Sequence, residues 1–193
     1  MEKLHEVLSG VKCAAVSGHV NPDGDCTGSC LATYNYIKEN YPDIQIDVYL
    51  DPIPNIFKFL KSSDEIKAPG TEKKEYDLFL AQDCGDAARL GAAEHYFHEA
   101  KKTVCIDHHK SNGAFADINY IYPEASSTSE LIYDLIEDEK ISKAVAECIY
   151  LGIVHDTGVF QYSCTSSKTM NIAGRLMDKG IDFTRIINDT FFE

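Results

Sequence analysis

Short apolar runs that end in or lead into acidic or histidine residues constrain the fold of this chain more than any other feature. Four of these runs are predicted strands: residues 11–17, 44–50, 77–83 and 102–107. A helix is predicted over residues 27–40, where Leu31, Tyr34 and Ile37 share one face. Strands that alternate with helices are typical of a parallel sheet, because parallel strands need crossover connections. We therefore predict an α/β fold with a mostly parallel central sheet flanked by helices.

The second half of the chain is predicted to be helical. The predicted helices cover residues 128–139, 142–154, 167–179 and 182–191. A run of hydroxyl residues, Ser126 to Ser129, precedes the first of them, and its side-chain oxygens are suited to capping a helix. At 193 residues the chain has the size of one ordinary domain.

Composition excludes several classes of protein. The net charge of −13 argues against binding to long nucleic acid, since that requires clustered Lys and Arg. The apolar runs are much shorter than the roughly 20 residues that span a bilayer. The first residues also lack the basic and apolar regions of a signal peptide. We expect a cytoplasmic protein that does not enter membranes.

The cysteines indicate a reducing environment. There are seven, an odd number, and no two form a CxxC pair, so we interpret them as reduced thiols in a core. Cys26 and Cys30 lie one helical turn apart. Zinc binding would explain this spacing, but packing in the core is the favoured interpretation.

Four separated segments place carboxylates and imidazoles at the predicted ends of strands or helices. They are residues 18–25 (GHVNPDGD), 82–85 (QDCG), 107–109 (DHH) and 155–158 (HDTG). In open α/β sheets the loops beyond the carboxyl ends of the strands converge on one ligand site. These segments are therefore expected to meet, although a turn or a helix cap would explain each one alone.

Together the four segments supply five Asp and four His, a mixture of oxygen and nitrogen ligands. Such a set suits a divalent cation, with Mn²⁺ favoured and Mg²⁺ or Co²⁺ acceptable. Structural zinc is disfavoured, because closed zinc sites usually combine Cys and His at short spacings. A catalytic metal centre is the better interpretation.

The order HxxxDxD, QDCGD, DHH and DTG resembles the DHH family of phosphoesterases over nearly the whole chain. The resemblance implies a first metal held by His19, Asp23 and Asp83. It implies a second metal held by Asp25, Asp83, His108 and Asp156, so that Asp83 bridges the pair. His109 would contact the scissile phosphate and protonate the leaving group. Asp107 would orient a neighbouring histidine.

The likeness is greatest to the oligoribonuclease and 3′-phosphoadenosine 5′-phosphate phosphatase branch, which implies a phosphorylated nucleotide or short RNA as substrate. Arg89 would pair with a substrate phosphate, although a solvated charge on a helix explains this arginine equally well.

Residues 1–180 would form the catalytic domain and 181–193 the start of a linker helix. Because the sequence has no adjacent glycines, we expect the DHHA1-type substrate domain of the family to be absent.

Other activities fit the same residues. Related families with this metal core hydrolyse cyclic dinucleotides or pyrophosphate. A chain that lacks the substrate domain could also bind metals, or assemble as a homodimer, with no useful turnover. A generic α/β domain whose acidic loops bind nothing is the remaining alternative.

Overall fold

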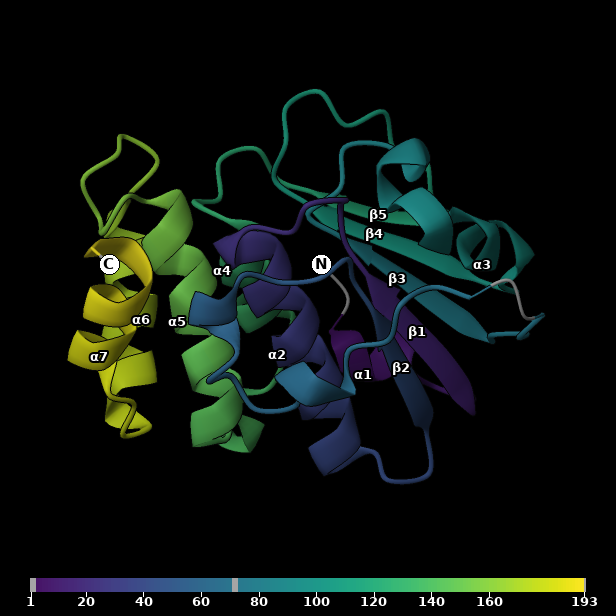
Figure 1. The fold of residues 1–193 in the computed structure, drawn as a ribbon, viewed down its shortest axis with the longest axis horizontal. Coiled ribbons are helices and arrows are strands. Elements are labelled where there is room, and N and C mark those ends of the chain that lie inside the picture. The colour runs from purple at the N-terminus through teal and green to yellow at the C-terminus, as the bar shows by residue number, and fades with distance from the viewer. Residues whose placement is uncertain (1–2, 71–72, 193) are drawn as a thin grey trace.

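The computed structural model describes residues 3–70 and 73–192. Five parallel strands form one sheet in the order β2-β1-β3-β4-β5, as Figure 1 shows. The strands are β1 Cys13–Ser17, β2 Gln45–Tyr49, β3 Leu78–Gln82, β4 Thr103–Asp107 and β5 Ile118–Ile121. The predicted α/β fold is confirmed. The short edge strand β5 was not predicted, since its residues are only partly buried apart from Tyr120 and carry little apolar signal.

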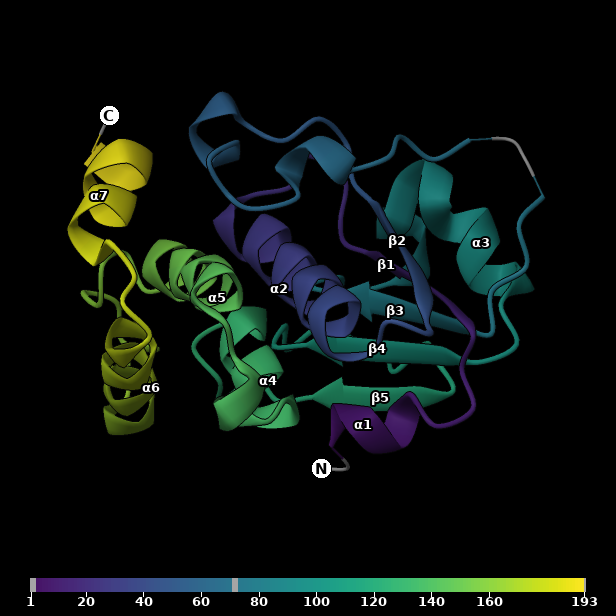
Figure 2. The same cartoon turned by 90° about the horizontal axis from the view of Figure 1, so that it is seen from below.

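Helices lie on both faces of the sheet and extend beyond it. They are α1 Leu4–Val7, α2 Gly24–Asn40, α3 Glu94–Glu99, α4 Thr128–Leu135, α5 Lys143–Asp156, α6 Ser167–Asp178 and α7 Phe183–Ile187. Figures 1 and 2 show α2 and α4 near the sheet, α5 beyond them, and α6 and α7 at the far end. Among the described residues, no helix combines the length and the apolar character needed to cross a membrane.

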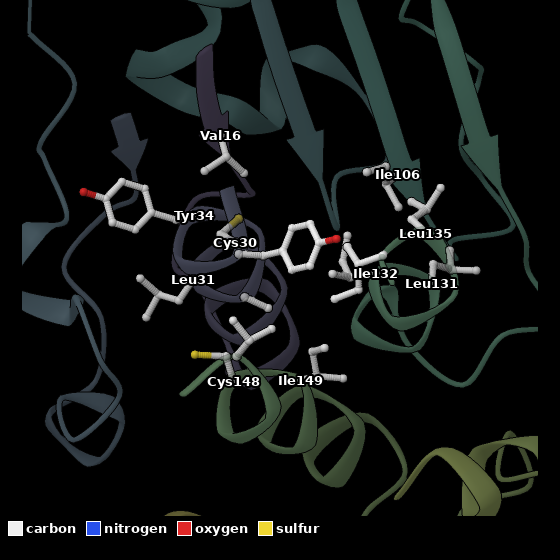
Figure 3. Close-up of a cluster of buried hydrophobic side chains, with 14 of the residues drawn as sticks. Val16, Cys30, Leu31, Tyr34, Ile106, Leu131, Ile132, Leu135, Cys148 and Ile149 are labelled. Atoms are coloured by element: carbon white, nitrogen blue, oxygen red, sulfur yellow. The ribbon is translucent and has the colours of Figure 1, made fainter. Parts of the chain in front are cut away.

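Successive side chains along each strand point to opposite faces of the sheet, so the apolar core has two parts. Val16, Leu80 and Ile106 belong to the larger part, which α2, α4 and α5 complete (Figure 3). Ala15 and Phe79, on the opposite face, pack with residues of α3 in the smaller part. The larger part thereby fixes α2 and α4 against one face of the sheet and α5 against those two helices.

Three predicted helix boundaries were wrong by at least three residues. Helix α2 begins at Gly24, inside the predicted 18–25 loop, because Asp23 Oδ1 accepts hydrogen bonds from the N–H groups of Asp25 and Cys26. Helix α4 ends at Leu135, before the predicted residue 139, where the chain becomes extended. Helix α7 covers Phe183–Ile187, and a π-helical turn, Asn188–Phe192, replaces the rest of the predicted 182–191 helix.

Two glycines bring the backbones of α2 and α5 into contact. A Cβ atom at Gly28 would lie 2.4 Å from the carbonyl oxygen of Cys148 in α5. One at Gly152 would lie 2.7 Å from Asp25 Oδ1 in α2 and 1.9 Å from Ser129 Oγ. Neither position has room for a side chain. This close crossing places Asp25, in the first turn of α2, near Asp156 at the last residue of α5.

We predict that Gly28→Ala destabilises the protein by about 1–3 kcal/mol, because the added methyl group overpacks the α2–α5 contact. The matched control is Gly174→Ala in α6, where a Cβ atom would meet nothing within 4 Å. This control should raise stability by about 0.5–1 kcal/mol through helix propensity. Urea unfolding measures both changes. Equal stability of Gly28→Ala and the wild type would contradict the close contact.

Candidate metal centre

The six predicted metal ligands lie in one cluster at the carboxyl edge of the sheet. His19 follows β1, Asp83 follows β3 and His108 follows β4. Helix α2 contributes Asp25 from its first turn and Asp23 as its N-cap residue, and α5 contributes Asp156. Parallel strands and two glycine-packed helices therefore assemble residues that are up to 137 positions apart, counted from His19 to Asp156.

Asp83 lies at the centre of the cluster, and its side chain is only 3% exposed. Its Oδ2 lies 3.5 Å from Nε2 of His19, and its Oδ1 lies 3.6 Å from Nε2 of His108. The two oxygens of one carboxylate thus face two different imidazoles. The residue also has φ of 51°, a left-handed conformation that is uncommon for residues other than glycine and that concentrates at functional sites.

The first half of the cluster surrounds His19. Its Nδ1 is 2.8 Å from the carbonyl oxygen of Val20, and its Nε2 is 3.6 Å from Asp23 Oδ2. A hydrogen bond from Nδ1 to the carbonyl leaves Nε2 as the atom that can bind a cation. Cys26 borders this half, because its sulfur lies within 4.8 Å of ligand atoms of His19 and Asp83. Cys26 and Cys30 are both fully buried, and Cys30 packs in the apolar core (Figure 3).

The second half surrounds His108. Its Nε2 lies 3.0 Å from Asp156 Oδ2 and 3.8 Å from Asp25 Oδ2. Asp25 is fully buried, and its two oxygens accept hydrogen bonds from the backbone N–H groups of Thr128 (2.6 Å) and Ser129 (2.9 Å). These groups belong to the first turn of α4, where the helix dipole favours a negative charge.

The hydroxyl run before α4 therefore contributes more than a helix cap. Ser127 Oγ does accept the capping hydrogen bond from the N–H of Glu130 (3.0 Å), in agreement with the capping prediction. Thr128 Oγ1 also donates to Asp83 Oδ1 (3.2 Å), so this residue contacts both central carboxylates. The sequence signal for these contacts is the run itself, which resembles a family segment next to the site, although helix capping alone would explain it.

The electrostatics of the cluster favour a bound cation. Burial raises the pKa of Asp25 well above its usual value, and the nearby charges of Asp83 and Asp156 raise it further. Burial alone would lower the pKa of His108, but the hydrogen bond with Asp156 and the surrounding carboxylates raise it to about 9. The carboxylates of the cluster repel one another, and this repulsion favours the binding of protons or cations among them. Divalent cations would supply that charge, and the carboxylate and imidazole donors suit them.

His109 is held beside this cluster by Asp107. Its Nδ1 is 2.7 Å from Oδ1 of the fully buried Asp107, while Asn112 Nδ2 donates to Oδ2 at 2.7 Å. The His109 side chain is 47% exposed, so Nε2 is the ring nitrogen available to a ligand. The hydrogen bond to Asp107 raises the pKa of His109. Asn112 was not predicted, because a single loop asparagine carries no motif.

Arg89 lies near His109 but apart from the metal ligands. It belongs to a 3₁₀ helix, Ala87–Ala93, that follows Asp83 in the chain. A cavity of about 360 Å³ has its walls formed by Gly85, Asp86, Arg89, His109, Ser111 and Gly113. The structure therefore places Arg89 at a neighbouring cavity that has none of the six metal ligands in its wall.

The sequence is similar to a known protein family and to several known proteins. The sequence model of the DHH family, N-terminal domain, matches residues 14–153. The bifunctional oligoribonuclease and PAP phosphatase NrnA of Bacillus subtilis is 31% identical over 90% of this chain and 55% of its own length. The cyclic-di-AMP phosphodiesterase PdeA of Listeria monocytogenes is 28% identical over 94% of this chain and 30% of its own.

A solved structure has the same architecture. An exopolyphosphatase-related protein from Bacteroides fragilis superposes with a TM-score of 0.91 at 28% identity, covering 98% of this chain and 59% of that protein. The chain thus spans between half and three-fifths of the length of the Bacillus relative and of the Bacteroides protein.

We predict that the wild-type chain binds two Mn²⁺ ions and that Asp23→Asn and Asp156→Asn each bind one. Asp83→Asn should weaken both sites, because its two oxygens face both halves of the cluster. Metal analysis after dialysis gives the stoichiometry, and the rise in melting temperature with Mn²⁺ gives an independent readout. Asp86→Asn is the control, since its exposed carboxylate lies outside the cluster. Two tightly bound ions in Asp83→Asn would rule out a bridging role.

Proposed function

The chain belongs to the DHH family, and from this membership we propose that it forms the catalytic core of a metal-dependent phosphoesterase. The proposed substrates are short oligoribonucleotides and 3′-phosphoadenosine 5′-phosphate, the two substrates for which the Bacillus relative is named. One observation carries the proposal: the two oxygens of Asp83 face separate histidine and carboxylate groups. That arrangement suits a carboxylate shared by two cations.

In the proposed site, His19, Asp23 and Asp83 hold one cation, and Asp25, Asp83, His108 and Asp156 hold the other. When bound, two divalent cations stabilise the charge of the phosphoryl group and lower the pKa of the attacking water. Mn²⁺ is the proposed ion because the donors are carboxylates mixed with imidazoles. The backbone N–H groups of α4 hold the Asp25 carboxylate in place and oppose the rise in its pKa that burial causes.

We assign proton transfer to His109. Its Nδ1 is engaged by Asp107, and this hydrogen bond raises the pKa of the ring and so favours its protonated form. A protonated Nε2 can donate to the oxygen of the leaving group as its bond to phosphorus breaks. Asp107 acts through His109, by fixing its tautomer and orientation, and does not itself contact substrate.

Hydrolysis of a cyclic dinucleotide is the second candidate, and the similarity to the Listeria phosphodiesterase favours it.

Residues 1–180 are the proposed catalytic domain, and 181–193 are the proposed start of a linker helix. The proposed location is the cytoplasm, because all seven cysteines are free thiols.

We predict Mn²⁺-dependent hydrolysis of 3′-phosphoadenosine 5′-phosphate and of a diribonucleotide, with activity abolished in Asp83→Ala. Release of inorganic phosphate and of mononucleotide measures the two reactions. Cyclic di-AMP and pyrophosphate complete the substrate panel. Turnover of cyclic di-AMP alone would make the second candidate the correct one. Two bound metals with no turnover of any substrate would indicate a metal-binding module.

We also predict that His109→Gln slows hydrolysis according to the leaving group. A diribonucleotide has a poor alkoxide leaving group, so loss of a general acid should lower kcat roughly 100- to 10,000-fold. Hydrolysis of bis(p-nitrophenyl) phosphate should fall much less, because nitrophenolate leaves without protonation. His98→Gln, an exposed histidine on α3, is the control. Equal losses on both substrates would assign His109 to phosphate binding instead of proton donation.

A further inference from the structure

The cavity beside His109 lies outside the metal cluster, and we propose that it is a subsite for a second phosphate group of the substrate. Arg89 and Ser111 would recognise that phosphate. The inference rests on the proposed phosphoesterase function and deepens it, because it names the substrate class: compounds that carry a second phosphate group next to the scissile one.

The position of the cavity separates it from the scissile phosphate. His109 lines it, but none of the six proposed metal ligands does. On its other side, His109 Nδ1 lies 3.7 Å from Asp83 Oδ1. The imidazole therefore stands between the metal cluster and the cavity. A phosphate held by the cluster would have its neighbouring group, across His109, in this cavity.

Arg89 supplies an uncommitted positive charge. Its guanidinium makes no ion pair with any residue in the described ranges 3–70 and 73–192, although the chain has a net charge of −13. Its backbone is fixed at both ends: its N–H donates to Asp86 Oδ1 (3.1 Å), and its carbonyl accepts from the N–H of Val20 (2.8 Å). An arginine held by its backbone with a free fork of donors suits a phosphate.

The rest of the wall leaves room and adds a hydroxyl donor. A Cβ atom at Gly113 would meet nothing within 4 Å, and one at Gly85 would meet only Ser111 Oγ, at 3.8 Å. The wall contains one acidic side chain, Asp86, and one of its oxygens already accepts the Arg89 N–H. About 360 Å³ exceeds the needs of a single phosphate, so a sugar attached to it also fits.

A second cavity, of about 370 Å³ between α4 and the start of α6, does not offer the same chemistry. Its one lysine, Lys168, pairs with Asp134 and lies 3.6 Å from Glu130. The charges in its wall are therefore matched or negative. Of these two cavities, the Arg89 cavity is the better anion site.

The kinetic test compares a diadenylate with and without a terminal phosphate. The wild type should have a higher kcat/KM for pApA or ApAp than for ApA. In Arg89→Gln this ratio should fall roughly 10- to 100-fold, as expected for loss of a charge-assisted hydrogen bond, and in Ser111→Ala it should fall less. Arg175→Gln removes an exposed arginine from α6 and should keep the wild-type ratio. An unchanged ratio in Arg89→Gln would overturn the subsite.

A binding test separates this inference from the activity. Inorganic phosphate is titrated into the metal-free chain while amide NMR signals are followed. Shifts confined to Gly85, Ser111 and Gly113, and lost in Arg89→Gln, would support the subsite even if no substrate were hydrolysed. Absence of these shifts would overturn it, whereas loss of all hydrolysis with the shifts retained would refute only the proposed function.

Discussion

Mutual repulsion among buried carboxylates is the constraint on which the architecture of this protein depends. Asp25 and Asp83 are almost completely inaccessible to solvent and lie near Asp156, so the fold must offset their charges. It does so with backbone N–H groups from α4 and with two imidazoles. These groups come from α4 and from the segments that follow β1 and β4, and the α2–α5 contact at Gly28 holds together the helices that carry Asp25 and Asp156. Positive charge inside the cluster therefore favours this arrangement.

Much of the fold followed from the pattern of apolar residues. Four strands and the main helices were predicted, because buried parallel strands and amphipathic helices have distinct periodicities. Ends of elements were less predictable. Helix α2 begins inside a predicted loop because Asp23 accepts two capping hydrogen bonds. The pattern of apolar residues gives no sign of such bonds. The half-buried strand β5 carried too little apolar signal to be separated from a loop.

The positions of the candidate ligands were accessible from the sequence because acidic and histidine residues follow successive parallel strands. The structure brings all six into one cluster. Contacts made by backbone groups could not be predicted in this way. The N–H groups of Thr128 and Ser129 bind Asp25 whatever their side chains are, and Asn112 reaches Asp107 only because a loop folds back over β4. Side-chain chemistry is visible in a sequence, whereas backbone placement is not.

The use of backbone donors for Asp25 bears on how this segment can evolve. Ser129 Oγ has no hydrogen-bond partner among the described residues, so the hydroxyl at this position is not what holds the carboxylate. A Cβ atom at Gly152 would lie 2.7 Å from that of Ser129, which leaves space for little beyond a small side chain. Size therefore constrains the residue at position 129 more than hydrogen bonding does. Serine, alanine and glycine should therefore each be tolerated at this position, because the backbone N–H groups that bind Asp25 would remain in place.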